Sequence, residues 1–462
     1  MIFSQKSLTN QRKNAARLVR NYFFGGAEMP HFSVDDIRQK LFFSIDSLLD
    51  DRDTLLNNPN ASFTRKKKIS FLQTVLFIMT VGSDDVNEEL ESFFEEDKIP
   101  YPSAMIQRRS QIKPEAFVKL FDSFTEQIPL NELFMGYQVV AGDGSRLNLP
   151  YNPSDSYTFY KCIKKRKGMN QLHLNALYDV MNDVFLDVVL QSVPQMDEKA
   201  AFCEMLDKNK LKDESRKRIY LADRGYSAFN VFAHAIHNGQ LFLIRMPEAN
   251  VKTLCPDLGN WLDGEHVDRE VTINIGRQNT KKNRQLENYH SLSKSRRYDY
   301  AKAGSDEVDT LKFRILKFPI GKGSFEYIAT NLPAYSFGEA VIKRLYHLRW
   351  NEETAFRHLK YAGRMVNLHS LKPDFTMQEI YAKLTMYNFS SFVMKETAPD
   401  KKTDKYTYKV NHTKAQKSCV KFLKGLIKDL KKMISKHYVP VRLERQFGRT
   451  LRRQSADTLN YR

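Results

Sequence analysis

The chain has 462 residues, of which 42% are hydrophobic and 27% charged, and its 73 Lys and Arg residues against 54 Asp and Glu residues give a formal charge of +19. This balance is typical of a folded soluble chain and excludes an intrinsically disordered one. The longest strongly apolar stretch, residues 71–81, is too short to span a bilayer, and the basic N-terminus lacks the apolar segment of a signal peptide. Four separated cysteines without a CxxC pair argue against a disulfide framework or a zinc site, so we expect a cytoplasmic protein without a membrane partner.

Residues 1–135 are predicted to form a helical N-terminal domain. Ser33 is a candidate N-cap, Pro114 suits the first turn of a later helix, and apolar residues recur at helical spacing between them. The region is not net basic, because residues 1–140 hold 17 Lys and Arg against 19 Asp and Glu. Its beginning nevertheless carries five basic residues and no acid, namely Lys6, Arg12, Lys13, Arg17 and Arg20.

The pattern changes to strands near residue 137. "YQVVAGDGSRLNL" predicts a strand that ends at Asp143, and residues 170–193 alternate in a way that predicts a hairpin. After a predicted helix, "RIYLADRGYS" predicts a second apolar strand that ends in an acid, Asp223, and another helix and strand follow. Strands followed by helices indicate an α/β layer.

Residues 249–333 are again strand-like, and we expect no helix in them. They contain the basic stretch "KKNRQLENYHSLSKSRRYDY" and one of the two tryptophans, Trp261. The sequence leaves the role of Trp261 open, although a packed core aromatic is the more common use of such a residue. We interpret the segment as a β-rich insertion with a charged loop.

"YHLRWNEETAFRHLK", residues 346–360, predicts one short helix. Its polar side carries five residues at spacings close to whole helical turns, Tyr346, Arg349, Glu353, Arg357 and Lys360. Alone, such a stripe is more typical of a solvated surface with i,i+4 ion pairs than of a functional site. Glu352 falls on the apolar sector of the same helix.

Residues 395–462 are predicted to form a basic helical C-terminal region. They hold 19 Lys and Arg against 6 Asp and Glu, a net charge of +13 and thus about two-thirds of the excess of the whole chain. We expect "KFLKGLIKDLKKMISK" to form a helix whose apolar residues dock on the body and whose lysines face a polyanion. A dimerisation element or a solvated helix surface remains open as an alternative.

Asp143 and Asp223 are weak signals when each is taken alone, because Asp-Gly is foremost a turn dipeptide and an Asp after a strand can cap a helix. Functional groups do, however, collect at the carboxyl ends of strands in α/β sheets. Hard cations such as Mg²⁺ take carboxylate ligands, and a pair of ions about 3.5–4 Å apart can activate an attacking oxygen and stabilise a leaving one. Such a pair needs about three carboxylates, and Glu353 is the candidate third.

The spacing of Tyr346, Arg349, Glu353 and Lys360 resembles the YREK signature of DDE transposases of bacterial insertion sequences, in the IS-four group. "DGS" at 143–145 resembles the first acidic motif of that family, and "DRGY" at 223–226 resembles the second. The order of two Asp residues, a β-rich insertion and a Glu agrees as well. The resemblance covers about residues 135–365 well and the flanks loosely.

The resemblance implies an α/β fold with a ribonuclease H-like catalytic core. Residues 136–248 and 334–394 would form the two parts of this core, and residues 249–333 would form its β-rich insertion. A helical DNA-binding domain, residues 1–135, and the basic helical region, residues 395–462, would flank it.

The resemblance also implies the chemistry. Asp143, Asp223 and Glu353 would be the catalytic residues and the ligands of two Mg²⁺ or Mn²⁺ ions. Water would cleave a phosphodiester at the end of the element, and the freed 3′-OH would attack target DNA, as in cut-and-paste transposition. Five residues in and around the signature would contact DNA: Tyr346, Arg349, Trp350, Arg357 and Lys360. Among them, Trp350 is the candidate to hold a flipped base.

The partners that the resemblance implies are duplex DNA, both as terminal inverted repeats and as target, and a second copy of the chain on that DNA. We expect residues 1–130 and the basic loops at 161–167 and 281–297 to contact the element end. A nucleoid-associated location in the bacterial cytoplasm would follow.

Two other functions stay open on the sequence. A different metal-dependent nuclease on the same fold would share the acids but would not need the YREK helix or a large insertion. A catalytically inactive DNA-binding descendant is less consistent with three intact acids. For the third acid we favour Glu353 over Glu352, because the family spacing selects it and Arg349 shares its face.

Overall fold

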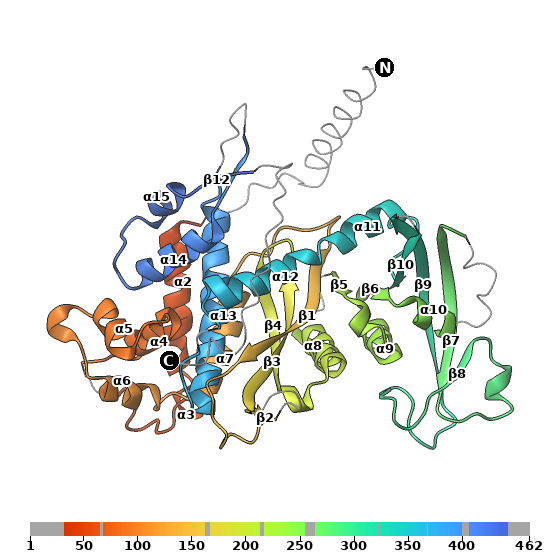
Figure 1. Cartoon of the computed structure of the whole chain (residues 1–462), viewed down its shortest axis with the longest axis horizontal. Coiled ribbons are helices and arrows are strands. Elements are labelled where there is room, and N and C mark those ends of the chain that lie inside the picture. Colours follow the sequence, from red (N-terminus) through yellow and green to blue (C-terminus); the bar gives the residue numbers. More distant parts are fainter. Residues whose placement is uncertain are drawn as a thin grey trace.

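The computed structural model describes residues 32–64, 68–161, 167–212, 217–254, 264–321, 323–366, 368–399 and 406–441. The five basic residues of the N-terminus, most of the loop at 161–167 and Trp261 lie outside these ranges. Along the longest axis, a helical body, a central sheet and a β-rich end follow one another (Figure 1). In the described part of the chain, no helix combines the length and apolarity that a membrane span requires.

The helical body is built mainly from the N-terminal third of the chain. Its helices are α2 (Val34–Asp46), α3 (Arg52–Leu55), α4 (Phe71–Thr80), α5 (Val86–Phe93), α6 (Pro102–Arg109) and α7 (Pro114–Glu126), with 3₁₀ turns at Ser47–Leu49 and Glu96–Lys98. Ser33 caps α2 in a capping box with Asp36, and Pro114 lies in the first turn of α7, so both helix starts that the sequence predicts are confirmed.

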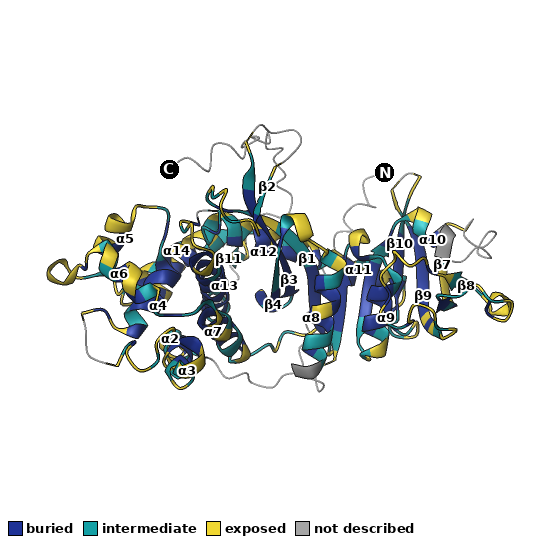
Figure 2. Cartoon of the chain, turned by 90° about the horizontal axis from the view of Figure 1, so that it is seen from below, coloured by how far each residue is buried: buried dark blue, intermediate teal, exposed yellow. Residues whose placement is uncertain are grey.

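Helix α13 (Pro373–Glu396) is the central element of this body, although it comes late in the chain. It contacts α2, α4 and α7 on one side and strand β4 (Val184–Ser192) of the sheet on another. Nearly all of its middle turns are buried (Figure 2). One continuous apolar cluster therefore joins the N-terminal helices, α13 and one face of the sheet. The domain boundaries predicted above remain predictions.

Within the described residues, the strands form a ten-stranded mixed sheet in the order β2-β3-β1-β5-β6-β10-β9-β7-β8, and β4 also pairs with β3. Strand β1 is parallel to β5, and β5 to β6, whereas β3 and β4 run antiparallel to their neighbours. The remaining bounds are β1 (Gln138–Asn148), β2 (Phe159–Tyr160), β3 (Met169–Asp179), β5 (Arg218–Ala222), β6 (Leu241–Met246), β7 (Val267–Gly276), β8 (Tyr289–Ser291), β9 (Val308–Gly321) and β10 (Ser324–Thr330).

Helices cover both faces of the sheet. α8 (Glu198–Lys212) and α9 (Phe229–His237) pack on the face that carries Val140, whereas α12 (Trp350–Arg357) and α13 pack on the face that carries Val139 and Ala141. α11 (Glu339–His347) precedes α12, and a π-helical turn, His358–Ala362, follows it. The α/β layer that the sequence predicts is thus present.

The hairpin predicted at residues 170–193 is confirmed, because β3 and β4 pair antiparallel across a turn in which Asp183 has a φ of 57°. The prediction that the preceding strand ends at Asp143 is wrong. β1 continues to Asn148 because β3 keeps pairing with it, from Asp143 opposite Ala176 to Asn148 opposite Gln171. Only its parallel partner β5 stops at the level of Asp143.

The prediction of one helix through residues 346–360 is also wrong. α11 ends at His347 and α12 begins at Trp350, because Leu348 and Arg349 donate their backbone N–H groups to carbonyls only three residues back. This tight turn interrupts the helix between α11 and α12. Tyr346 and Arg349 are consequently buried, with 6% exposure each, instead of lying on a solvated face.

Two further predictions need correction. The segment 249–333 is not free of helix, since α10 (Glu248–Leu254) runs into it and buries Val251. The basic C-terminal region forms α14 (His412–Leu423) and α15 (Leu430–Ser435), together with the short strands β11 (Tyr408–Lys409) and β12 (Val439–Pro440), instead of one helix over 421–436. Gly425, with a φ of +76°, ends α14, which leaves Leu426 exposed.

Candidate active site

Asp143, within β1, and Asp223, directly after β5, lie at the same level of the sheet. The parallel pairing of β1 with β5 ends at Gly142 opposite Ala222, and each of these residues is followed by an Asp. The carboxyl ends of parallel strands meet at one edge, where side chains of adjacent strands can converge. Asp223 is fixed locally, because its Oδ1 accepts the backbone N–H of Gly225 at 2.6 Å.

Glycines on both sides of Asp143 allow neighbouring elements to pack close to β1. A Cβ at Gly142 would lie 2.2 Å from the ring of Phe202 in α8, and a Cβ at Gly144 would lie 2.2 Å from the ring of His173 in β3. Both rings are buried. Phe202 and His173 thus fill the α8 face beneath Asp143, while the Asp143 side chain points to the opposite face.

Arg349 joins Asp143 to the helix that carries the third acid. Its Nη2 donates to Glu353 Oε1 at 2.9 Å, and its Nη1 lies 3.9 Å from Asp143 Oδ2. The Arg349 side chain is only 8% exposed, and its guanidinium lies over the rings of Tyr346 and Trp350. The structure therefore brings Asp143, Arg349 and Glu353 together, although the tight turn divides the signature between two helices.

The charges that act on the pKa of Asp143 include those of both other predicted acids. The pKa of Asp143 is raised to about 6, chiefly by burial. The backbone N–H of Gly144 and the charge of Arg349 act to lower this pKa, and the charges of Asp223 and Glu353 act to raise it. Like-charge clusters of this kind are a frequent property of functional sites.

Glu352 lies deeper than Glu353 in the same first turn of α12. It has 0% exposure, and neither of its carboxyl oxygens has a hydrogen-bond partner. Burial raises its pKa well above the ordinary value, and the charge of Asp143 raises it further. The prediction that Glu352 faces the buried side of its helix is thus correct.

Sequence reasoning missed three residues of this neighbourhood. Burial raises the pKa of the Tyr226 phenol well above the ordinary value, and the next contributions come from four carboxylates, Asp143, Glu198, Glu352 and Asp223. Glu198 opens α8, and its Oε1 lies 2.9 Å from His173 Nε2. In the sequence, Tyr226 is recognisable as part of the "DRGY" motif. Glu198 is visible only as an acid at the start of a helix, and His173 only as a polar residue in an apolar strand.

The residues predicted to contact DNA differ in their exposure to solvent. Tyr346 is buried, Lys360 is half-buried, and Arg357 is exposed. Burial lowers the pKa of Lys360, and burial raises that of Tyr346. Trp350 is 52% exposed at the start of α12. An exposed indole beside the acids can stack on a base, and exposed cations beside it can approach phosphates.

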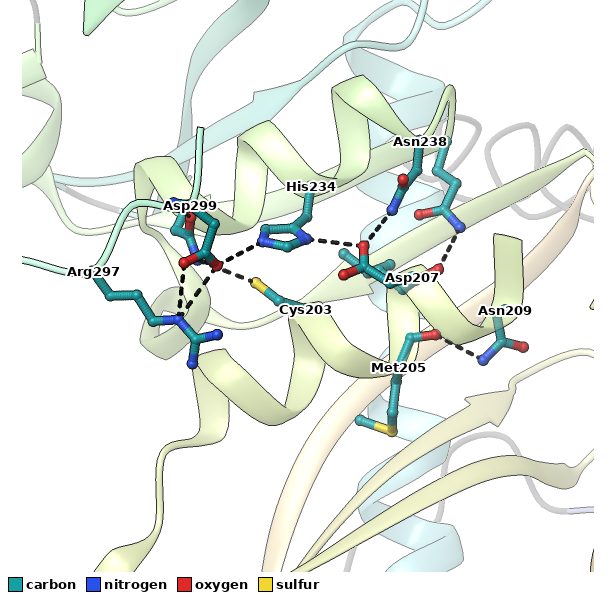
Figure 3. A network of polar contacts seen from close by, with 11 residues as sticks. Cys203, Met205, Asp207, Asn209, His234, Asn238, Arg297 and Asp299 are labelled. Carbon is teal, nitrogen blue, oxygen red and sulfur yellow. Dashed lines mark hydrogen bonds and ion pairs between the residues drawn. The ribbon is translucent and has the colours of Figure 1, made fainter. Parts of the chain in front are cut away.

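Part of the basic loop at 281–297 lines a cavity of about 420 Å³ between the insertion and the α8–α9 face. Its cationic lining includes Lys199, Arg296 and Arg297. The loop is anchored behind this cavity, because His234 of α9 lies between Asp207 of α8 and Asp299, at 2.9 and 3.0 Å (Figure 3). The anchor fixes the position from which Arg297 faces solvent.

The acids fit a hard divalent cation in their chemistry. They offer only carboxylate oxygens, which Mg²⁺ and Mn²⁺ prefer. As the side chains stand, no group of three His, Cys, Asp or Glu residues within the described ranges is arranged so that it could hold a metal ion. Arg349 instead bridges two of the acids.

Comparisons with known proteins give two results. Residues 135–389, more than half of the chain, match the family described as "Transposase DDE domain". Among solved structures, the chain is similar to that titled "Cryo-EM structure of piggyBac transposase synaptic complex with hairpin DNA", with 9% sequence identity and a TM-score of 0.40 over 88% of this chain and 80% of that one. A comparison with curated proteins finds no match.

Proposed function

Because the chain belongs to the family of proteins with a transposase DDE domain, we propose that it is an insertion-sequence transposase of the IS-four group with a YREK signature. It cleaves DNA at the ends of its element and joins them to target DNA in cut-and-paste transposition. The observation that carries this proposal is that Asp143 of β1 and Asp223, directly after β5, lie at a common level of the sheet, with Glu353 linked to Asp143 through Arg349.

The strand order supports a ribonuclease H-like core within this proposal. Three antiparallel strands, β4, β3 and β1, continue into the parallel strands β5 and β6, and helices cover both faces. Strands β7 to β10 extend the same sheet beyond β6 as the insertion, before α11 and α12 return the chain to β1. The insertion thus separates the second and third acids in the chain.

The roles follow from the site. The family generally depends on divalent metal, and two Mg²⁺ or Mn²⁺ ions held by Asp143, Asp223 and Glu353 would activate an attacking oxygen and stabilise the leaving oxygen. Arg349 holds the Glu353 carboxylate and keeps a positive charge near Asp143. Buried neighbours on the α8 face exclude water from one side of Asp143.

We assign the DNA contacts to the surface around α12. Trp350 presents an exposed ring for base stacking, and Arg357 and Lys360 lie along the same helical stretch as phosphate contacts. Lys199 of α8 and Arg296 and Arg297 of the insertion line a separate cavity on the α8–α9 face, and we assign them further phosphate contacts there. Two copies of the chain would each hold one end of the element.

Strand transfer tests the function directly. DNA that carries the sequences flanking the encoding gene is incubated with the protein, Mg²⁺ and a supercoiled target plasmid. We expect Mg²⁺-dependent joining of DNA ends to the target. Cleavage without joining would indicate a nuclease on the same fold, and DNA binding without cleavage would indicate an inactive descendant.

A further inference from the structure

We propose that the cavity of about 420 Å³ between the insertion and the α8–α9 face binds a nucleoside phosphate, with its phosphate on three cationic side chains and its base beside an aromatic pair. The inference rests in part on the proposed function, because it names the class of ligand for the phosphate contacts assigned there. α12, which begins with Trp350, packs on the opposite face of the sheet. The cavity is therefore a second place for a nucleotide, apart from the surface of α12.

The first argument is the charge of the side chains that line the cavity. Three of them are cationic, Lys199, Arg296 and Arg297, and Asp197 is the one acid among the described lining residues. Asp197 is engaged elsewhere, because its Oδ1 accepts the backbone N–H of Ala200 at 3.0 Å and so caps the start of α8. Arg297 pairs with a neighbouring acid of its own loop, whereas in the described part of the chain no ion pair holds Lys199 or Arg296. Their charges are therefore available to an anion such as phosphate.

The second argument is that the loop 293–301, which carries both arginines, is held in position without a ligand. The guanidinium of Arg277 donates to four carbonyl groups of this loop at 2.8–3.1 Å, those of Ser293, Arg296, Tyr298 and Ala301. The loop is also tied to α9, because the Asn230 side chain donates to Asp299 Oδ2 and accepts the Asp299 backbone N–H, both at 2.9 Å. Figure 3 shows Asp299 at this anchor, directly beside Arg297. Since the loop is preorganised, a ligand does not have to supply the free energy of ordering it.

The third argument is the chemistry beside the cations. Phe229 of α9 and His290 of β8 both line the cavity, with ring centroids 5.3 Å apart and ring planes inclined by 53°. Aromatic rings give a nucleic-acid base a surface on which to stack. Ser227 and Asn250 line the same cavity and offer a hydroxyl and an amide to the polar edge of a base or to the sugar. A bare phosphate would need none of these groups, and the volume is typical of a small-molecule site.

The experiment measures the binding of deoxyadenosine 5′-monophosphate, deoxyadenosine and inorganic phosphate to the full chain by isothermal titration calorimetry, without metal ions and with EDTA present. Wild type is compared with Arg296→Gln and Phe229→Leu. Lys302→Gln is the matched control, because Lys302 is exposed just after the same loop and is not among the described residues that line the cavity. The Tm of each variant is measured as well. Arg296 is exposed, so its replacement tests the inference even if Phe229→Leu unfolds.

We expect wild type to bind the monophosphate at least roughly tenfold more tightly than deoxyadenosine or phosphate alone, because both parts of the ligand are contacted. Arg296→Gln should weaken binding of the monophosphate roughly tenfold and leave that of deoxyadenosine unchanged. Phe229→Leu should weaken both and leave phosphate binding unchanged, and Lys302→Gln should behave like wild type. A monophosphate bound no more tightly than phosphate would indicate a simple anion site, and equal losses in Arg296→Gln and Lys302→Gln would indicate unspecific attraction. Either result would overturn the inference.

Competition identifies the source of the nucleoside phosphate, which is either an unstacked nucleotide of a DNA strand or a free nucleotide. Displacement of the bound monophosphate by a short single-stranded oligonucleotide, but not by a blunt duplex, would assign the cavity to DNA, and displacement by neither would assign it to free nucleotide. Equal displacement by the duplex would place the contacts on a paired backbone and overturn the inference. Strand transfer by a wild type that does not bind the monophosphate would overturn the inference alone, whereas monophosphate binding without strand transfer would overturn only the proposed function.

Discussion

At the scale of single residues, Gly142 shows how closely the position of Asp143 depends on the side chains packed under β1. The space that a Cβ would need is taken by the ring of Phe202, which is 1% exposed and cannot move aside cheaply. Phe202 also packs on Tyr226, at 5.1 Å between ring centroids. A larger side chain at Gly142 would therefore displace both Asp143 and, through Phe202 and Tyr226, the loop after Asp223.

We predict that Gly142→Ala lowers the free energy of unfolding by about 1–3 kcal/mol, the usual cost of overpacking a buried position. Chemical denaturation measures this change. Gly321→Ala is the control, since nothing lies within 4 Å of a Cβ there, and it should stay within about 0.5 kcal/mol of wild type. Equal stability of the two variants would show that Phe202 yields to the added methyl group.

The sequence predicts some residues of the site, and others become apparent only from the structure. Asp143, Asp223 and Glu353 were predicted, and the structure makes the first two neighbours through strand register. The packing of α12 on β1 could not be predicted, because the helical wheel gives the sector of Glu352 but not the element that packs against it. Glu198 comes from a helix whose position on the sheet depends on long-range packing.

At the scale of elements, the course of β1 and α12 departs from local patterns for physical reasons. β1 continues past Asp143 because a long antiparallel partner, β3, satisfies its backbone groups after β5 has ended. The predicted helix divides at Leu348 and Arg349, and the turn there places Arg349 in the interior, 3.9 Å from Asp143 of β1. Neither partner is adjacent in sequence, so local periodicity contains no information about them.

Lys383 of α13 is a buried lysine whose titration affects the stability of the fold. It is 3% exposed, its Nζ donates to the carbonyl of Val81 at 3.3 Å, and burial lowers its pKa to about 8 against the raising effect of Glu379. The unfolded chain binds the proton more tightly, with a pKa near 10.5. Stability is therefore reduced below pH 8 and recovers as the pH rises from 8 to 10.5.

We predict that Lys383→Met raises the free energy of unfolding at pH 7 by about 1–3 kcal/mol, because a charged lysine in this position costs about 3 kcal/mol and its replacement removes one hydrogen bond. The gain should shrink between pH 8 and 10.5, as measured by denaturation at several pH values. The exposed Lys372→Met serves as the control and should show no such trend. A gain that is constant with pH would contradict the assigned titration.

At the scale of the whole molecule, the flanking regions are parts of one core. The C-terminal residues Cys419, Phe422, Leu430 and Ile434 are buried, and Lys424 pairs with Glu89 of α5 at 3.0 Å. The N-terminal helices share the apolar cluster of α13. Removing residues 395–462 or 1–130 would therefore expose core surface, so the roles of these regions are better tested by surface substitutions.

The C-terminal region presents exposed lysines at helical spacing on α14 and α15. We predict that replacing Lys414, Lys417, Lys421, Lys431 and Lys432 by Gln weakens DNA binding and flattens the dependence of log K on log salt by about 0.9 for each phosphate that is no longer neutralised, or several units in total. All five side chains are exposed, so Tm should be unchanged. Salt titrations of binding measure the slope, with the exposed Lys98→Gln and Lys119→Gln as controls. An unchanged slope would leave dimerisation or solvation as the role of these lysines.

The central claim is that Asp143, Asp223 and Glu353 act as one metal-dependent site for DNA cleavage. The most direct measurement is nicking of supercoiled plasmid with and without Mg²⁺ by wild type, Asp143→Asn, Asp223→Asn and Glu353→Gln, alongside DNA binding by each. The account predicts Mg²⁺-dependent nicking by wild type, at least a roughly hundredfold loss in every single variant, and DNA binding within about threefold of wild type. Full nicking activity in any one of the three variants would contradict it.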